Sequence, residues 1–125
     1  MKTVAIAITA MLAAATSALA AEPAKVMDTS AGKVLADTKG MTLYSFDKDE
    51  AGKSNCYDQC AVNWPPLMAE GGAMADGDWT IVERTDGSKM WAYKNMPLYT
   101  FIADKAAGDV AGDGKNGVWH VVKAE

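Results

Sequence analysis

The sequence predicts a mainly β fold, in which two internally repeated antiparallel β-hairpin units pack together as one small domain. At most one short helical turn is expected, near the pair of cysteines. Two observations support this prediction. Segments 55 residues apart match each other, and the matching segments alternate in polarity as strands do. A chain of 125 residues, half of them hydrophobic, is also the size of one domain.

The internal repeat is clearest in its aromatic residues and in one aspartate. Tyrosine, phenylalanine and tryptophan are scarce, so matches of all three in register indicate a duplication. The matched pairs are Tyr44 with Tyr99, Phe46 with Phe101, Asp49 with Asp104 and Trp64 with Trp119. We therefore expect a single β domain over 33–125, made of repeats at about 33–67 and 79–123.

The first twenty residues have the composition of a signal peptide. Lys2 precedes an apolar run over 4–15, and Ala18 and Ala20 form the small-x-small pattern that a signal peptidase cleaves. The run is shorter than the ~20 residues that span a bilayer, and no Cys follows it to carry a lipid. We expect a signal peptide over 1–20, a flexible leader over 21–32, and a periplasmic or secreted protein that is not lipidated and has no transmembrane segment.

Strands are predicted on both sides of one turn in each repeat. Gly40 and Asn95 are of the residue types that best tolerate a positive φ, so both repeats are expected to turn there. A strand candidate lies before each turn and an alternating segment follows it, so each repeat is expected to open with a β-hairpin. The predicted strands cover 33–37, 43–46, 79–84, 89–93, 98–101 and 118–123.

Cys56 and Cys60 are the only cysteines of the chain. Disulfides persist in exported proteins, and this spacing places both sulfur atoms on one side of a helical turn, within bridging distance. We predict a disulfide within a short helical turn over 56–62, which Asn55 caps and which ends before Trp64. A metal site and a redox role are the alternatives.

These motifs together resemble the bacterial secreted-repeat family, described as predicted lipoproteins with a Y-x-[FWY]-x-x-D motif. Residues 44–49 and 99–104 both fit that motif, and the cysteine pair, the Trp-Pro-Pro-Leu segment at 64–67 and the closing segment 117–121 complete the resemblance. It covers the chain from about 34 to 122. The resemblance implies an exported repeat protein without an assigned activity. Because the lipidated Cys is missing, it implies no membrane anchor.

Several aspartates are candidates for a calcium site. An Asp that follows a strand can accept backbone N–H bonds and hold a loop, or its oxygens can bind Ca²⁺. The segment after Phe46 has oxygens at positions one and three of a calcium loop and Gly52 at six. However, Ala51 stands at five and Asp58 at twelve, where a Glu is expected. The candidate ligands are Asp47, Asp49, Asp104, Asp109 and Asp113.

Copper is the competing metal, because Cys56, Cys60, His120 and the methionines offer the soft and imidazole ligands that it prefers. The methionines are mostly isolated along the sequence, which favours gap-filling in a core. We expect no cofactor, with Ca²⁺ or copper as the alternative.

The sequence shows no catalytic constellation, so we expect a protein that is not an enzyme. The only histidine, His120, is tied to no nucleophile, and a net charge of −4 without a basic cluster argues against nucleic acid. Trp91 and Tyr93 fall on one strand face and, if exposed, would bind a partner. The expected function is a non-catalytic binding or interaction module of the bacterial envelope, with an unknown envelope protein or glycan as partner. A metal-binding protein is the alternative.

Overall fold

The structure, a computed structural model, describes residues 23–124 and is mainly β. Its strands form three small antiparallel sheets. β1 (Ala24–Thr29) pairs with β2 (Gly32–Asp37), β3 (Tyr44–Phe46) pairs with β7 (Trp119–Val121), and β4 (Trp79–Glu83), β5 (Lys89–Tyr93) and β6 (Met96–Pro97) form the third sheet. A short helix, α1 (Gln59–Asn63), and a 3₁₀ turn, η2 (Lys115–Gly117), complete the fold. The predicted fold class is confirmed.

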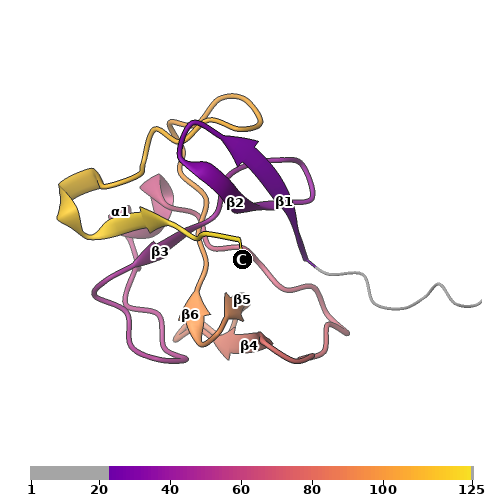
Figure 1. Cartoon of the computed structure of the whole chain (residues 1–125). Helices are drawn as coiled ribbons and strands as arrows, with labels where there is room; N and C mark the ends of the chain where they lie inside the picture. Colours follow the sequence, from indigo (N-terminus) through magenta and orange to yellow (C-terminus); the bar gives the residue numbers. More distant parts are fainter. Residues whose placement is uncertain (1–22, 125) are drawn as a thin grey trace, which may run out of the picture.

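Each repeat contributes one long hairpin. In the first repeat β1 and β2 pair with Val26 opposite Leu35, and in the second repeat β4 and β5 pair with Ile81 opposite Trp91. The two hairpins lie on either side of the C-terminal segment (Figure 1), and Ala24 and Leu35 of the first pack in one core cluster with Trp79 of the second. The duplicated sequence thus gives a duplicated structure.

The prediction of a flexible leader over 21–32 is wrong from Ala24 onward, because β1 begins at that residue. All six of its residues pair with β2, and Ala24 is buried. The connection is a tight turn in which the Thr29 hydroxyl accepts from Ala31 N–H at 3.0 Å and Gly32 has a φ of 96°, a value that Gly adopts freely. The expected signal peptide over 1–20 lies outside the described residues.

The turns at Gly40 and Asn95 are confirmed, since both residues have a positive φ, 89° and 68°. The hairpin expected around the first turn forms but is short. Thr42 bridges to Ala36, with Asp37 N–H donating to the Met41 carbonyl at 2.8 Å and Leu43 N–H to the Leu35 carbonyl at 3.0 Å, and the chain then continues into β3, which pairs with β7. In the second repeat the hairpin forms, but β6 has only two residues.

The repeats exchange their closing segments. Residues 122–124, at the end of the second repeat, pair with β2 of the first, through Leu35 N–H to the Val122 carbonyl at 2.8 Å and Ala124 N–H to the Lys33 carbonyl at 3.0 Å. Residues 67–69, at the end of the first repeat, pair in the same way with β5. There Trp91 N–H donates to the Leu67 carbonyl at 2.8 Å. Each repeat therefore supplies the strand that completes the other's sheet.

The Cys56–Cys60 disulfide is confirmed, and the helix beside it is shorter than predicted. Asp58 stands at the helix N-cap without a side-chain cap bond. Asn55, the expected cap, instead donates its side-chain amide to the Lys48 carbonyl at 2.8 Å. Across residues 23–124, none of the helices has the length and apolar character needed to cross a membrane.

Candidate functional site

The two motif tyrosines meet at the centre of the molecule. Tyr44 N–H donates to the Tyr99 carbonyl at 2.8 Å, and Tyr99 N–H donates to the Tyr44 carbonyl at 3.0 Å. Both side chains are fully buried. This reciprocal pair relates the repeats by an approximate two-fold axis, because equivalent residues exchange equivalent bonds across it.

The hydroxyl of each tyrosine binds the motif aspartate of the other repeat. Tyr44 donates to Oδ2 of Asp104 and Tyr99 donates to Oδ2 of Asp49, both at 2.7 Å. The second oxygen of each carboxylate accepts a backbone N–H, from Ala111 at 2.9 Å for Asp104 and from Asn55 at 2.7 Å for Asp49. The two aspartates therefore hold loops in shape and link the repeats. This agrees with the structural interpretation of these residues, one of the two that the sequence allowed.

Burial is the main influence on the ionisation of these groups. It raises the pKa of Asp49 and of Asp104, although their hydrogen bonds act in the opposite direction. Burial, together with the neighbouring carboxylate, also raises the pKa of Tyr44 and of Tyr99. Both phenols therefore stay protonated and remain donors at neutral pH.

The raised pKa values predict how stability depends on pH. Since the folded state binds these protons more tightly than the unfolded state, the contribution of both carboxyls to stability is full below the ordinary Asp pKa and falls as the pH rises through the raised pKa. Asn at position 49 or 104 cannot titrate. The unfolding free energy of wild type minus that of Asp49→Asn or Asp104→Asn is therefore expected to decrease from pH ~3 to ~7 in urea titrations. A difference that grows over this range would contradict the burial effect.

Four aromatic rings stack around the same axis. Trp64 and Trp119 lie face to face at 3.8 Å between ring centroids and 3° between planes. Phe101 stacks on the outer face of Trp64 at 4.0 Å and Phe46 on that of Trp119 at 4.1 Å. Every motif aromatic therefore belongs to the core, where stacked rings contribute beyond their buried area.

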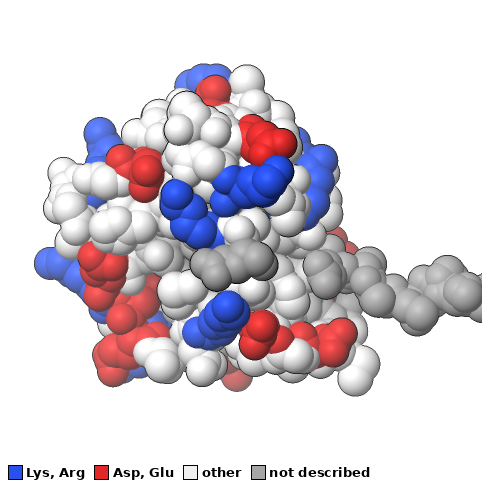
Figure 2. All heavy atoms as spheres, viewed as in Figure 1, with Lys and Arg blue, Asp and Glu red and all other residues white. Residues whose placement is uncertain are grey.

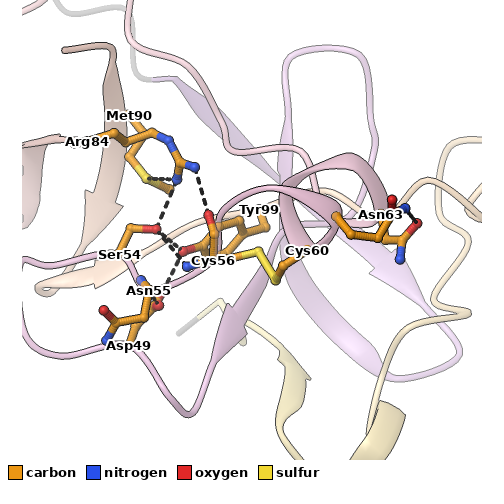
Figure 3. Close-up of a disulfide and its surroundings, with 10 residues drawn as sticks. Asp49, Ser54, Asn55, Cys56, Cys60, Asn63, Arg84, Met90 and Tyr99 are labelled. Atoms are coloured by element: carbon orange, nitrogen blue, oxygen red, sulfur yellow. Dashed lines mark hydrogen bonds between the residues drawn. A yellow bond between two sulfur atoms is a disulfide. The ribbon is translucent and has the colours of Figure 1, made fainter. Parts of the chain in front are cut away.

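The two tyrosine sites differ in one respect, which the sequence did not reveal. Arg84 is buried and donates through Nη1 to Ser54 Oγ at 2.9 Å and through Nη2 to the Cys56 carbonyl at 2.7 Å. Ser54 Oγ lies 2.6 Å from the Tyr99 hydroxyl, which in turn binds Asp49. Figure 3 shows this chain beside the disulfide. At the Tyr44 site, Gly112 N–H takes the place of Ser54, at 3.1 Å.

The candidate calcium ligands are not brought together. Asp47 pairs with His120, Oδ2 to Nε2 at 2.8 Å, and Asp109 accepts from the N–H groups of Lys105 and Ala106. Asp113 accepts from Val121 N–H at 3.1 Å. Within residues 23–124, no three His, Cys, Asp or Glu side chains converge as a metal site would require.

The candidate copper ligands are separated by chemistry as well as by position. Cys56 and Cys60 are joined in the disulfide and offer no thiolate. His120 makes its contact with Asp47. Of the methionines, Met90 fills the core as expected, with its sulfur 3.6 Å from Arg84 Nη1. The same expectation is wrong for Met68, Met74 and Met96, which are exposed.

The three aromatic residues of the second repeat that are not part of the motif belong to a second core cluster. Trp91 and Tyr93 are half-buried on one face of β5, as the sequence predicted, and Trp79 of β4 is buried beside them. Trp79 meets Trp91 edge to face at 6.1 Å and Tyr93 at 4.9 Å between centroids. We call these three residues the aromatic shelf.

Two grooves border the aromatic shelf. One, of about 470 Å³, is lined by Trp91 with Leu67, Met68 and Met74 among others. The second, of about 410 Å³, is lined by Trp79 and Tyr93 with residues of both hairpins. The aromatic shelf is therefore accessible from two hollows.

Comparison with known proteins gives one finding. A family model described as a secreted repeat of unknown function matches the chain twice, over residues 25–68 and 80–123. The two matches cover more than half of the chain. They agree with the two structural repeats, and the first match includes nearly all of β1. No curated protein and no solved structure matches the chain.

Proposed function

Because the chain belongs to the family of secreted repeats of unknown function, we propose that it is a non-catalytic binding module of the bacterial envelope. The composition of the first twenty residues supports export to the periplasm without a lipid anchor. The observation that carries the proposal is the aromatic shelf, which presents large rings at two grooves. The proposal needs no cofactor.

The motif residues support a scaffold role rather than catalysis. Each motif carboxylate and each motif phenol is bound by a partner from the other repeat, so these groups are occupied in holding the fold. The disulfide also removes both thiols as nucleophiles.

The aromatic shelf is a difference between two otherwise equivalent hairpins. Its ring positions in the second repeat correspond to Ala24, Leu35 and Asp37 in the first, by the registers of the two hairpins. Trp79 packs in a core cluster with Ala24 and Leu35 of the first hairpin, whereas Trp91 and Tyr93 are only partly covered there. Half-exposed Trp and Tyr side chains are typical of binding surfaces, where they supply most of the affinity.

The distribution of surface charge favours a site that binds through aromatic contacts over one that binds through a strong electrostatic field. On the face shown in Figure 2, basic and acidic side chains are interspersed, and no broad patch of one sign is present there. Association driven by a strong field needs such a patch. We therefore attribute specificity to contact with the rings.

Cosedimentation with isolated bacterial envelope fragments tests the proposal. We expect the wild-type protein to pellet with the fragments and Trp91→Ala/Tyr93→Ala to bind about tenfold more weakly, because loss of central aromatic contacts costs at least ~1.4 kcal/mol. Ile102→Ala is the matched control, since Ile102 is an apolar residue, 51% exposed, outside both grooves. The proposal is wrong if the wild type stays in solution or if the double variant pellets as the wild type does.

A further inference from the structure

The rings of the aromatic shelf are held in place before any ligand arrives. Trp79 is buried and braces Trp91 at 89° and Tyr93 at 47° between ring planes. Trp91 and Tyr93 lie on β5, which pairs with β4 along its whole length. A fixed ring loses little conformational entropy on binding, which favours affinity.

The two grooves are of a size to accept successive units of one ligand. Their volumes, about 470 and 410 Å³, fall in the range of small-molecule sites. Trp91 lines the first and Tyr93 the second, and residues two apart on a strand stand about 7 Å from each other. A ligand with repeated ring-sized units can therefore contact both.

The polar groups at the grooves are mainly acceptors. Glu70 lines the first groove, and Asp76 and Asp78 line the second. Their carboxylates make no hydrogen bond or ion pair with any side chain or N–H group in the described part of the chain, 23–124. Ionised carboxylates only accept hydrogen bonds, so the matching ligand is rich in donors.

The charges near the rings disfavour a cationic ligand. Lys94 Nζ lies 5.3 Å from the centroid of Tyr93, Lys39 lines the first groove, and Lys89 shares the outer face of β5 with the two rings. These ammonium groups repel a second cation, while the carboxylates repel an anion. The rim therefore suits an uncharged, donor-rich ligand.

We infer that the aromatic shelf binds a glycan of uncharged sugar rings, a conclusion that rests on the proposed binding function. A pyranose ring has a face of C–H groups that packs on the electron-rich face of Trp or Tyr. Its hydroxyl groups donate to carboxylates at the rim. A glycan of this kind therefore matches the aromatic rings, the carboxylate acceptors and the balanced charge of the site.

Calorimetric titration with two probes, a β-1,4-linked tetrasaccharide of N-acetylglucosamine and one of glucose, tests the inference. We expect saturable binding of at least one, little changed between 50 mM and 500 mM salt because an uncharged ligand is not screened. Trp91→Ala and Tyr93→Ala are expected to weaken it about tenfold. Asp76→Asn/Asp78→Asn, which alters only exposed side chains, is expected to weaken it about fivefold. Ile102→Ala is expected to bind as the wild type does.

Several outcomes would overturn the inference. One is the absence of saturable heat with either tetrasaccharide at millimolar concentration. A second is equal binding by the wild type and by variants that circular dichroism shows to be folded. Binding of a lysine-containing peptide that is lost at high salt, without binding of either sugar, would assign a peptide ligand instead. If neither sugar binds, whether or not the peptide does, cosedimentation with envelope fragments that depends on the aromatic shelf would still support the binding module. The two proposals therefore fail separately.

Discussion

Replacing Tyr44 by Ala is expected to lower the free energy of unfolding by about 3–5 kcal/mol, the usual cost of removing a buried aromatic ring. The ring is fully buried and meets Trp64 edge to face at 5.3 Å and Phe101 at 6.3 Å between centroids. Its loss leaves a cavity beside the stacked rings, and the Asp104 carboxylate loses a donor. Urea unfolding at constant pH measures the effect.

Two further variants separate the contributions. Tyr44→Phe keeps the ring and removes only the hydroxyl, so we expect a loss of about 1–3 kcal/mol from the buried carboxylate left without its donor. Tyr93→Ala is the matched control for an aromatic ring that is only half-buried, and its loss is expected to be smaller than that of Tyr44→Ala. A cost below about 1 kcal/mol for Tyr44→Ala would show that the ring does not hold the core.

The sequence predicted the duplication and the disulfide but not how the repeats combine. A period of 55 residues identifies Tyr44 with Tyr99 and Asp49 with Asp104. It does not say whether each tyrosine binds the aspartate of its own repeat or of the other. The structure shows the crossed arrangement, which depends on three-dimensional packing that periodicity cannot specify.

The two missed elements, β1 and the Arg84 network, also depend on distant partners. The segment 24–29 contains a lysine and an aspartate and has little strand propensity of its own, and it becomes a strand because β2 lies alongside. Arg84 follows a strand as a surface residue would. It is buried because Ser54 and the Cys56 carbonyl, about 30 residues earlier in the chain, satisfy its guanidinium.

The exchange of closing strands, together with the crossed tyrosine–aspartate bonds, makes each repeat incomplete without the other. The first repeat lacks the strand 122–124 when alone, and the second lacks 67–69. Each would also expose half of the stack, since Trp64 and Trp119 belong to different repeats. Separated repeats are therefore expected to lose the whole fold as monomers, because such small units bury too little surface.

Dividing the chain between Gly71 and Gly72, which lie in open space, tests this account most directly. The fragments 23–71, with its disulfide kept oxidised, and 72–125 are prepared separately and then mixed. We expect each fragment alone to give the collapsed amide NMR spectrum of an unfolded monomer, and the equimolar mixture to give a dispersed spectrum with a cooperative thermal transition. A dispersed spectrum from either fragment as a monomer would show that a repeat folds by itself and would contradict the account.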